Sequence, residues 1–490
     1  MTPALLSLLF SISTLTNRVA PPGTQLHVRL TSAVGSYASR AGSPLSAVLI
    51  APLTLDGETA LRTGTILSGK VKAVTRVGFG VRHEIAGLDL EFNQLISLEG
   101  GKIPISARVA EVDNGRERVN RDGRIHGVRS TGSLCYRVSG YIRTALQWEF
   151  HAALAVWAIR SILVQLPEPE IYYPAGVELT LNLSRPLFLG ALLNPGQEIA
   201  GQLTDDRRDE LERVVASLPY RTHAPGSGRS SDLTNVLFIG SHDQVVTAFD
   251  AAGWIQANRS SVRGRINWIR AVAERRGDLA APMSPLLLNG AEPDMSWEKG
   301  LNDVSKRHHI RMWREAPTWN GQEIWIGAAT RDIDFAYLRP GGRLTHKIDE
   351  NIDQERDKVA YDLAFTSCAD ILDWTTREGL PRSARNATGD PITTDGRIVV
   401  MELNACREPR MSTETVDWML LPEHGDKLQR FARREILSAR NELLRTNPFW
   451  RTYEGTRWIV DYVRWRRRQA ADQELLTNSR PSALPQFAVK

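Results

Sequence analysis

Two apolar runs that flank the dipeptide Asn320-Gly321 constrain the fold of this chain more than any other feature. Both runs have strand-like sequence, and Asn-Gly is a preferred pair for a two-residue turn between antiparallel strands. The runs also carry polar side chains, within His308–Trp313 and Trp325–Ile333. Polar groups in apolar strands either line a site or satisfy one another in a core.

A two-residue turn at this dipeptide fixes the register of the hairpin. It predicts that His309 faces Asp332 and that Arg311 faces Thr330. All four side chains then share one face of the sheet with Trp313. A slip of one residue would move each of them to the opposite face.

The other face and the following segments complete the predicted sheet. Arg331 lies on the other face, and a second hairpin at Gly341-Gly342 brings His346 opposite Tyr337. We therefore expect antiparallel strands over about 307–315, 323–333 and 344–348. A helix is expected next, from 349 to about 374, with acidic side chains recurring along one face.

Three interpretations of these polar strands remain open. In the first, His309 and Asp332 form a buried structural pair. In the second, a cationic pocket binds a phosphate-like anion, because guanidinium groups match oxyanions; its ligand-binding candidates are Arg311, Arg331 and Lys347, together with His346. In the third, catalytic groups act as general base and orienter or as metal ligands; the candidates are His309, Asp332 and His346.

The sequence names no reaction, cofactor or metal. Adjacent residues of a strand point to opposite faces, so His308 and His309 do not easily bind one metal ion. The chain contains neither a His-Glu-Xaa-Xaa-His motif nor a Gly-Xaa-Ser-Xaa-Gly elbow.

The N-terminal region reads as β-rich over residues 21–112. Short alternating runs such as Gln25–Leu30, punctuated by Gly and Pro, predict a small β-barrel or sandwich. The run Pro22–Thr31 is echoed by Ala175–Ser184, so residues 172–204 are expected to return to the same domain.

The remaining segments suggest an α+β or α/β multidomain chain. Residues 113–170 are a loop and helical excursion, and 205–231 are a helix and a linker. Residues 232–445 form a mixed α/β domain with antiparallel hairpins, which opens on the buried strand Asn235–Gly240 and a helix from Asp243. Residues 446–490 are a basic aromatic helix followed by a disordered tail.

Two apolar segments bear on whether the chain is exported or contacts a membrane. Residues 1–20 contain the apolar run Ala4–Leu15, which favours an export signal, with a packed terminal segment or an uncleaved anchor as alternatives. Thr144–Leu166 approaches the length of a membrane span, but its charges favour a buried or amphipathic helix.

The C-terminal helix carries a basic cluster. Residues 426–468 have twelve Arg and Lys side chains against five acidic ones, more than the net charge of +5 of the whole chain. This helix is expected to break near Asn447-Pro448, and beyond the break Trp458, Tyr462 and Trp465 fall on one face. Aromatic side chains beside a basic cluster suit an anionic membrane surface, with docking on the chain's own domain as the alternative. The mild overall charge does not predict nucleic-acid binding.

The cysteines are few. Cys135, Cys368 and Cys406 are widely spaced and odd in number, so their spacing predicts neither a disulfide framework nor a zinc site. We expect them to be small buried apolar residues.

Several of these blocks together resemble one family. Asn235–Gly240, Gly253-Trp254, His308–Trp313, Trp325–Ile333 and Thr345–Asp357 are similar, in order and spacing, to the LssY C-terminal domain family over about 230–375. The N-terminal part shows no such resemblance. The resemblance implies a bacterial origin and an envelope context, and it supplies no catalytic residues.

The expected function follows from the site and the resemblance. We expect a bacterial envelope-associated protein, exported to the periplasm or envelope, or cytoplasmic if residues 1–20 are not a signal. Its LssY-like domain would bind an anionic small molecule. The alternative is a hydrolase acting on a phosphate ester or similar anion through the His, Arg and Asp side chains. No transmembrane bundle is predicted.

Overall fold

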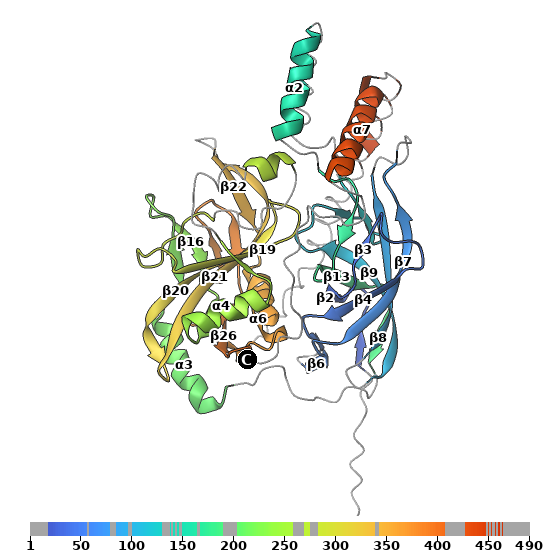
Figure 1. Cartoon of the computed structure of the whole chain (residues 1–490). Helices are drawn as coiled ribbons and strands as arrows, with labels where there is room; N and C mark the ends of the chain where they lie inside the picture. The colour runs from blue at the N-terminus through green and yellow to red at the C-terminus, as the bar shows by residue number, and fades with distance from the viewer. Residues whose placement is uncertain are drawn as a thin grey trace, which may run out of the picture. The chain divides into compact units, whose positions relative to one another are not determined.

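The computed structural model describes residues 18–55, 58–78, 85–96, 100–129, 149–163, 167–189, 203–257, 269–274, 283–338, 343–406 and 427–446, with single positions between 138 and 146 and between 449 and 463. The chain divides into two compact units, Met1–Glu423 and His424–Lys490. The first contains a barrel and a mixed sheet with helices (Figure 1), which confirms the expected α+β multidomain class.

Six antiparallel strands close into the N-terminal barrel (Figure 1). They follow one another in the order β8–β7–β4–β2–β13–β9, and β9 pairs with β8 to complete the circle. The strands are β2 (Gln25–Leu30), β4 (Pro44–Leu49), β7 (Ile66–Thr75), β8 (Gly87–Ile96), β9 (Lys102–Val112) and β13 (Glu178–Leu183). Of the two predicted alternatives, barrel or sandwich, the structure is the barrel.

The barrel core follows from side-chain alternation along its strands. In β9 every second residue is buried, from Ile103 through Ile105 and Ala107 to Val109. Such a period of two places the apolar side chains of a strand on one face of the sheet. A closed barrel also leaves no unpaired strand edge.

The echoed segments are neighbouring strands. β13 pairs with β2 in an antiparallel register that brings Leu181 opposite Leu26. Each strand is preceded by a glycine with positive φ, Gly23 at 88° and Gly176 at 99°. Both glycines donate their backbone N–H across the pair, Gly23 to Leu183 and Gly176 to Leu30. The two segments therefore repeat the same turn and strand about an approximate twofold axis.

Short strand pairs and a helix accompany the barrel. Helix α2 (Phe150–Leu163) lies in the predicted helical excursion, but Leu154 and Ile159 are exposed rather than buried. The short strands are β1 (Arg18–Ala20) with β14 (Leu187–Leu189), β3 (Val34–Gly35) with β12 (Tyr172–Tyr173), β5 (Leu53–Leu55) with β6 (Glu58–Leu61), and β10 (Arg118–Val119) with β11 (Arg124–His126).

The second body of this unit is a mixed sheet. Its order is β18–β19–β20–β21–β17–β26–β23, with β22 also paired to β21, and only β17 and β26 run parallel. The strands are β17 (Val236–Ile239), β18 (Ile255–Gln256), β19 (Met295–Gly300), β20 (Arg307–Trp319), β21 (Gln322–Leu338), β22 (Arg343–Ile348), β23 (Ala369–Thr376) and β26 (Arg397–Leu403). A small hairpin, β24 (Ser383–Arg385) with β25 (Pro391–Thr393), lies outside it.

Helices cover both faces of this sheet. On one face, α4 (His242–Ala251) and α6 (Ile352–Phe365) pack on a core that contains Phe238 and Trp297. On the other, α3 (Asp205–Ser217) packs on a core that contains Trp313. A strand buried between two such layers reads as a continuous apolar run, as predicted for β17.

The expected linker forms part of this body instead. Strands β15 (Arg221–His223) and β16 (Ser230–Leu233) pair as a hairpin, and residues 224–229 form the loop between them. Gly226 and Gly228 both adopt positive φ there, so the Gly-rich composition reflects a turn between strands rather than a flexible tether.

The predicted hairpin is present, with a shifted register. Trp319 faces Gln322 at the Asn320-Gly321 turn, but an irregularity between Glu315 and Thr318 adds two residues to β20. Pro317 lies in this bulge, where its missing N–H removes no ladder hydrogen bond.

The shift by two corrects the pairings and preserves the faces. His309 faces Thr330 rather than Asp332, which faces Arg307, and Arg311 faces Ala328. The second hairpin is shifted likewise: His346 faces Phe335 rather than Tyr337, and its expected turn at 341–342 lies outside the described residues.

The helix expected over 349–374 is also corrected. It begins at Ile352, where Asn351 accepts a hydrogen bond from the Asp353 backbone N–H, and ends at Phe365. Ser367 then takes a positive φ of 61°, and β23 follows.

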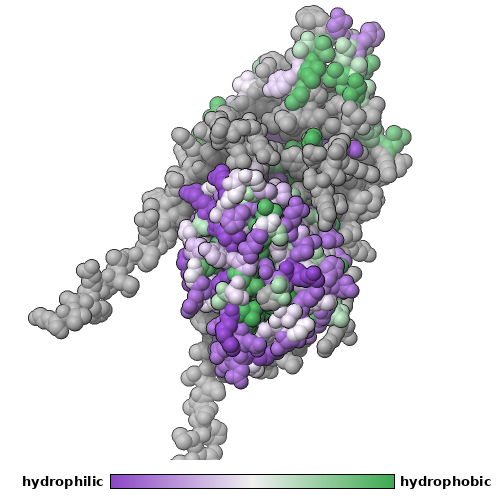
Figure 2. Space-filling view, turned by 90° about the vertical axis from the view of Figure 1, so that its left-hand side faces the viewer, coloured by the Kyte–Doolittle hydropathy of each residue, from purple (hydrophilic) through white to green (hydrophobic). Residues whose placement is uncertain are grey.

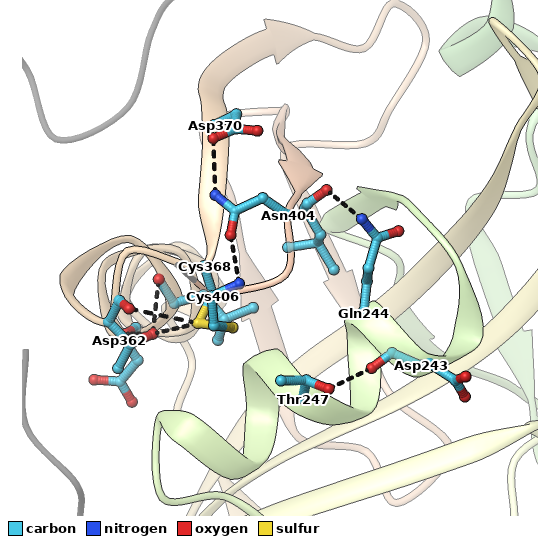
Figure 3. The surroundings of a disulfide bond; sticks show 11 residues. Asp243, Gln244, Thr247, Asp362, Cys368, Asp370, Asn404 and Cys406 are labelled. Carbon is cyan, nitrogen blue, oxygen red and sulfur yellow. Dashed lines mark hydrogen bonds between the residues drawn. A yellow bond between two sulfur atoms is a disulfide. The ribbon is translucent and has the colours of Figure 1, made fainter. Parts of the chain in front are cut away.

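A disulfide bond joins two of the three cysteines, contrary to the expectation from their spacing. Cys368 and Cys406 are linked across 38 residues (Figure 3), between the start of β23 and the end of β26. The Asn404 side chain braces the same turn: it donates to Asp370 and accepts from the Cys406 N–H. Cys135 lies outside the described residues.

The second unit contains one described long helix. α7 (Lys427–Thr446) ends directly before Asn447-Pro448, where proline was expected to break it. The predicted aromatic face beyond it, at 458, 462 and 465, and the tail over 471–490 lie outside the described residues, as do residues 1–17 of the predicted export signal.

Candidate functional site

Most of the candidate side chains meet on one face of the sheet. Strand alternation and the two-residue shift bring His309, Arg311, Asp332 and His346 together, as the face assignment predicts for the first three. Further polar residues join them from β16, β19 and β20. We call this group the polar cluster: Asp232, Glu298, Arg307, His309, Arg311, Asp332 and His346.

Arg307 bridges two carboxylates within the polar cluster. Its Nη1 donates to Glu298 Oε2 at 2.7 Å and its Nε to Asp332 Oδ2 at 3.1 Å. All three side chains are buried. Burial alone would raise the pKa of Asp332, but His309, His346 and Arg307 outweigh it, so this pKa is lowered and the carboxylate stays charged.

Two histidines flank the same carboxylate. His309 Nδ1 lies 3.6 Å from Asp332 Oδ1, and His346 Nδ1 lies 3.6 Å from Asp332 Oδ2. His309 Nε2 also shares a 2.7 Å hydrogen bond with the Thr330 hydroxyl. Burial, with Arg311 and Arg307 nearby, lowers the pKa of His309 to about 3, so its ring is neutral at pH 7. Burial lowers the pKa of His346 as well.

Arg311 is a buried cation with an incomplete set of acceptors. Its Nε donates to the Ser284 carbonyl at 3.1 Å, and its Nη1 lies 3.6 Å from Asp232 Oδ2. Nη1 is fully shielded and makes no hydrogen bond to the residues that the structure describes, and the same holds for His309 Nδ1. Burial raises the pKa of Asp232 despite Arg311, which favours the neutral carboxyl.

The other two ligand-binding candidates lie elsewhere. Lys347 is exposed. Arg331, on the opposite sheet face as predicted, contacts the barrel: its Nη2 donates to Glu111 at 2.6 Å and to Asp113 at 3.1 Å. The four side chains of the predicted cationic pocket are therefore divided between two faces of the sheet, because neighbouring residues of a strand point in opposite directions.

A second polar group joins the sheet to the barrel. We call it the barrel–sheet ion cluster; it contains five cationic and five anionic side chains: Arg29, Lys299, His308, Arg331 and Lys358 with Glu111, Asp113, Glu178, Glu355 and Asp362. The two kinds of charge alternate in space, so each buried ion has an opposite partner.

His308 pairs with two carboxylates of the barrel–sheet ion cluster. Its Nε2 lies 2.8 Å from Asp113, the residue that follows β9, and its Nδ1 lies 2.6 Å from Glu355 of α6. Burial disfavours its charge, but the Asp113 and Glu355 carboxylates outweigh burial and raise the pKa of His308 to about 9. The ring is therefore a cation at neutral pH.

Arg29 anchors the other end of this cluster. Its guanidinium is fully buried, donates to Glu178 at 2.7 Å and lies 5.2 Å from the Phe365 ring centre. Phe365 in turn packs against Val48 and Ile50 of the barrel. The barrel and the mixed sheet thus share an apolar contact as well as an ionic one.

No metal centre is formed by the part of the chain that the structure describes. Within it, no three His, Cys, Asp or Glu side chains are arranged to hold an ion. The polar cluster instead offers hydrogen-bond donors from Arg311, the imidazoles of His309 and His346, and the two carboxylates that Arg307 bridges.

Sequence reasoning missed Asp232 and Glu298 as members of the polar cluster. Both come from strands that approach β20 and β21 from outside the hairpin, so no local spacing marks them. Asp232 and Glu298 are acidic residues within strand-like segments, and this pattern could have marked them as candidates.

Comparison with known proteins agrees with the expected resemblance. Residues 215–398 match the family described as LssY C-terminus. The expected resemblance over 230–375 is therefore confirmed, and the LssY-like domain carries the entire polar cluster. The N-terminal barrel matches no family.

Comparisons with curated proteins and with solved structures give no further family. No curated protein matches the sequence. The structure of ComB10 of the Com type IV secretion system of Helicobacter pylori is similar to part of the chain, with 9% identity and a TM-score of 0.20. The similarity covers 36% of this chain and 92% of that one.

Proposed function

We propose that the LssY-like domain binds a small anionic ligand of the phosphate class through the polar cluster, in a protein exported to the bacterial envelope. The observation that carries the ligand proposal is a pair of buried nitrogens, Arg311 Nη1 and His309 Nδ1, that make no hydrogen bond within the described part of the chain. A buried donor without an acceptor costs free energy, which a ligand oxygen at that position would recover.

The chemistry of Arg311 suits an oxyanion. A guanidinium presents several N–H groups in one plane, and these match two oxygens of a phosphate or carboxylate. Asp232 Oδ2 lies 3.6 Å from Nη1, too far for a hydrogen bond, so Nη1 remains available to an oxygen of the anion. A bound anion would also favour protonation of His309, which could then donate a hydrogen bond.

The disulfide supports export. Disulfides persist in oxidising compartments and are rare in the bacterial cytoplasm. The Cys368–Cys406 bond therefore agrees with the apolar N-terminal run as a sign of transport out of the cytoplasm.

Anion binding is tested by thermal unfolding of the full chain with phosphate, sulfate or chloride at matched ionic strength. Phosphate is expected to raise Tm, and Arg311→Gln to abolish that increase. Arg314→Gln is the matched control, because Arg314 lies on the same strand but is exposed and paired with Glu323. A phosphate effect that is absent from the wild type, or equal in both variants, would refute the proposal.

A hydrolase is the second candidate, favoured by the placement of Asp332 between His309 and His346. An acidic side chain that orients a neutral imidazole is a common arrangement for a general base. Hydrolysis of p-nitrophenyl phosphate tests it: activity should be lost in His346→Gln and in Asp332→Asn while phosphate binding persists. If the wild type is inactive, the hydrolase is ruled out and only the proposed ligand binding remains.

A further inference from the structure

We propose that helix α2 inserts into the surface of a lipid bilayer, a contact distinct from both the polar cluster and the basic C-terminal tail. The segment before and within α2 exposes large apolar side chains. Tyr141 is 76% exposed, Leu154 49% and Ile159 56%. Val138 and Ile142 are exposed in the same way. Several exposed large apolar side chains within one short segment indicate an interaction site.

The exposure of α2 is not confined to one face. Leu154 and Ile159 are five residues apart, which corresponds to about 140° around a helix with 3.6 residues per turn. Within Met1–Glu423, none of the described helices and strands packs extensively against α2. In Figure 2, hydrophobic side chains lie beside hydrophilic ones at the top of the view.

This distribution favours lipid over a protein partner. A helix that docks in a protein groove presents one apolar stripe and keeps a polar face toward water. The sequence from Ala152 to Ile159 contains no charged or polar side chain other than the indole N–H of Trp157. Surroundings that are apolar on every side are the interior of a protein or the acyl chains of a membrane.

The charges at the ends of the segment complement a bilayer surface. Arg143 precedes the apolar stretch in sequence and Arg160 follows it. Long cationic side chains at the ends of an apolar segment extend toward lipid phosphates. Tyr141 is an aromatic residue of the type enriched at the membrane–water boundary.

The length of α2 limits how far it can extend into the bilayer. Its 14 residues extend about 21 Å, whereas a hydrocarbon core is about 30 Å thick. No helix among the described residues is long and apolar enough to cross a membrane. We therefore expect α2 to occupy one leaflet and to anchor the protein without spanning the bilayer.

The test is flotation of the full chain with vesicles of phosphatidylethanolamine and phosphatidylglycerol. The variant Leu154→Asp/Ile159→Asp should lower the vesicle partition coefficient at least tenfold, because it places charge where apolar side chains would be buried. The matched control is Ile66→Asp/Phe188→Asp, which adds the same charge at exposed apolar positions of β7 and β14, and it should bind as the wild type does.

A second measurement does not depend on those substitutions. An environment-sensitive fluorophore on Ala155→Cys, in a Cys135→Ser background, should shift to the blue when vesicles are added. Loss of flotation on deletion of residues 447–490, with no effect of the α2 variant, would overturn the proposal. So would a concentration-dependent dimer in lipid-free buffer that the α2 variant abolishes, without vesicle binding, because α2 would then contact a second copy.

Discussion

Removal of the Cys368–Cys406 bond should destabilise the LssY-like domain by an amount that follows from its loop length. The bond closes a loop of 38 residues. In the chain-entropy model, a crosslink that closes such a loop lowers the entropy of the unfolded chain. This raises the free energy of unfolding by about 4 kcal/mol at 25 °C. That is a large share of the total stability of a domain, which is about 5–15 kcal/mol.

The perturbation is the double variant Cys368→Ala/Cys406→Ala, compared with Cys135→Ala as the control. Tryptophan fluorescence reports the domain, because five of its tryptophans are buried in the two cores and residues 18–129 and 167–189 contain none. With a urea m value of about 2 kcal/mol/M, a loss of about 4 kcal/mol lowers the unfolding midpoint by about 2 M.

Two results would refute this reasoning. Alkylation of the denatured, unreduced wild type should modify a single cysteine; modification of all three would show that the bond does not form. A urea midpoint that is equal in the double variant and in Cys135→Ala would show that the bond forms but adds no stability. Refolding of the wild type in dithiothreitol should reproduce the double variant, without any change in side chains.

Two further predictions concern the barrel and its junction. The folded-state pKa of His308, about 9, lies above its unfolded value, so its contacts with Asp113 and Glu355 stabilise fully below about pH 6.5 and are lost as pH rises through about 9. The wild type should thus lose about 3 kcal/mol between pH 6.5 and pH 10 in thermal unfolding, and His308→Gln should remove this dependence; an unchanged slope would contradict the assignment. Gly69→Ala should destabilise the barrel by about 3 kcal/mol or more in urea unfolding followed by circular dichroism, because a Cβ there would meet the Glu91 carbonyl oxygen at 2.0 Å; wild-type stability would argue against this strand contact.

The sequence predicted well what depends on local chemistry. Asn320-Gly321 forms the turn because both residues take positive φ, 51° and 77°, which these two residue types tolerate best. Strand alternation then assigned His309, Arg311 and Asp332 to one face and Arg331 to the other. The pattern of the strands, rather than any long-range contact, carried that information.

What depended on distant contacts was missed. The bulge around Pro317 shifted the hairpin by two residues, and nothing in the local pattern fixed its size. The helix expected to reach residue 374 ends at Phe365 because the following residues pair with β26 as strand β23. The pairing of Cys368 with Cys406 depends on that same sheet, and their spacing alone gave no sign of it.

The position of β13 between β2 and β9 has a consequence for how the protein is made. Five of the six barrel strands are synthesised by residue 112, yet the circle stays open until residues 178–183 arrive after the helical excursion. During that interval β2 and β9 each have an unpaired edge, which can pair with another chain. We expect the nascent chain to depend on chaperones over this interval, and truncation before residue 178 to yield aggregates rather than a smaller barrel.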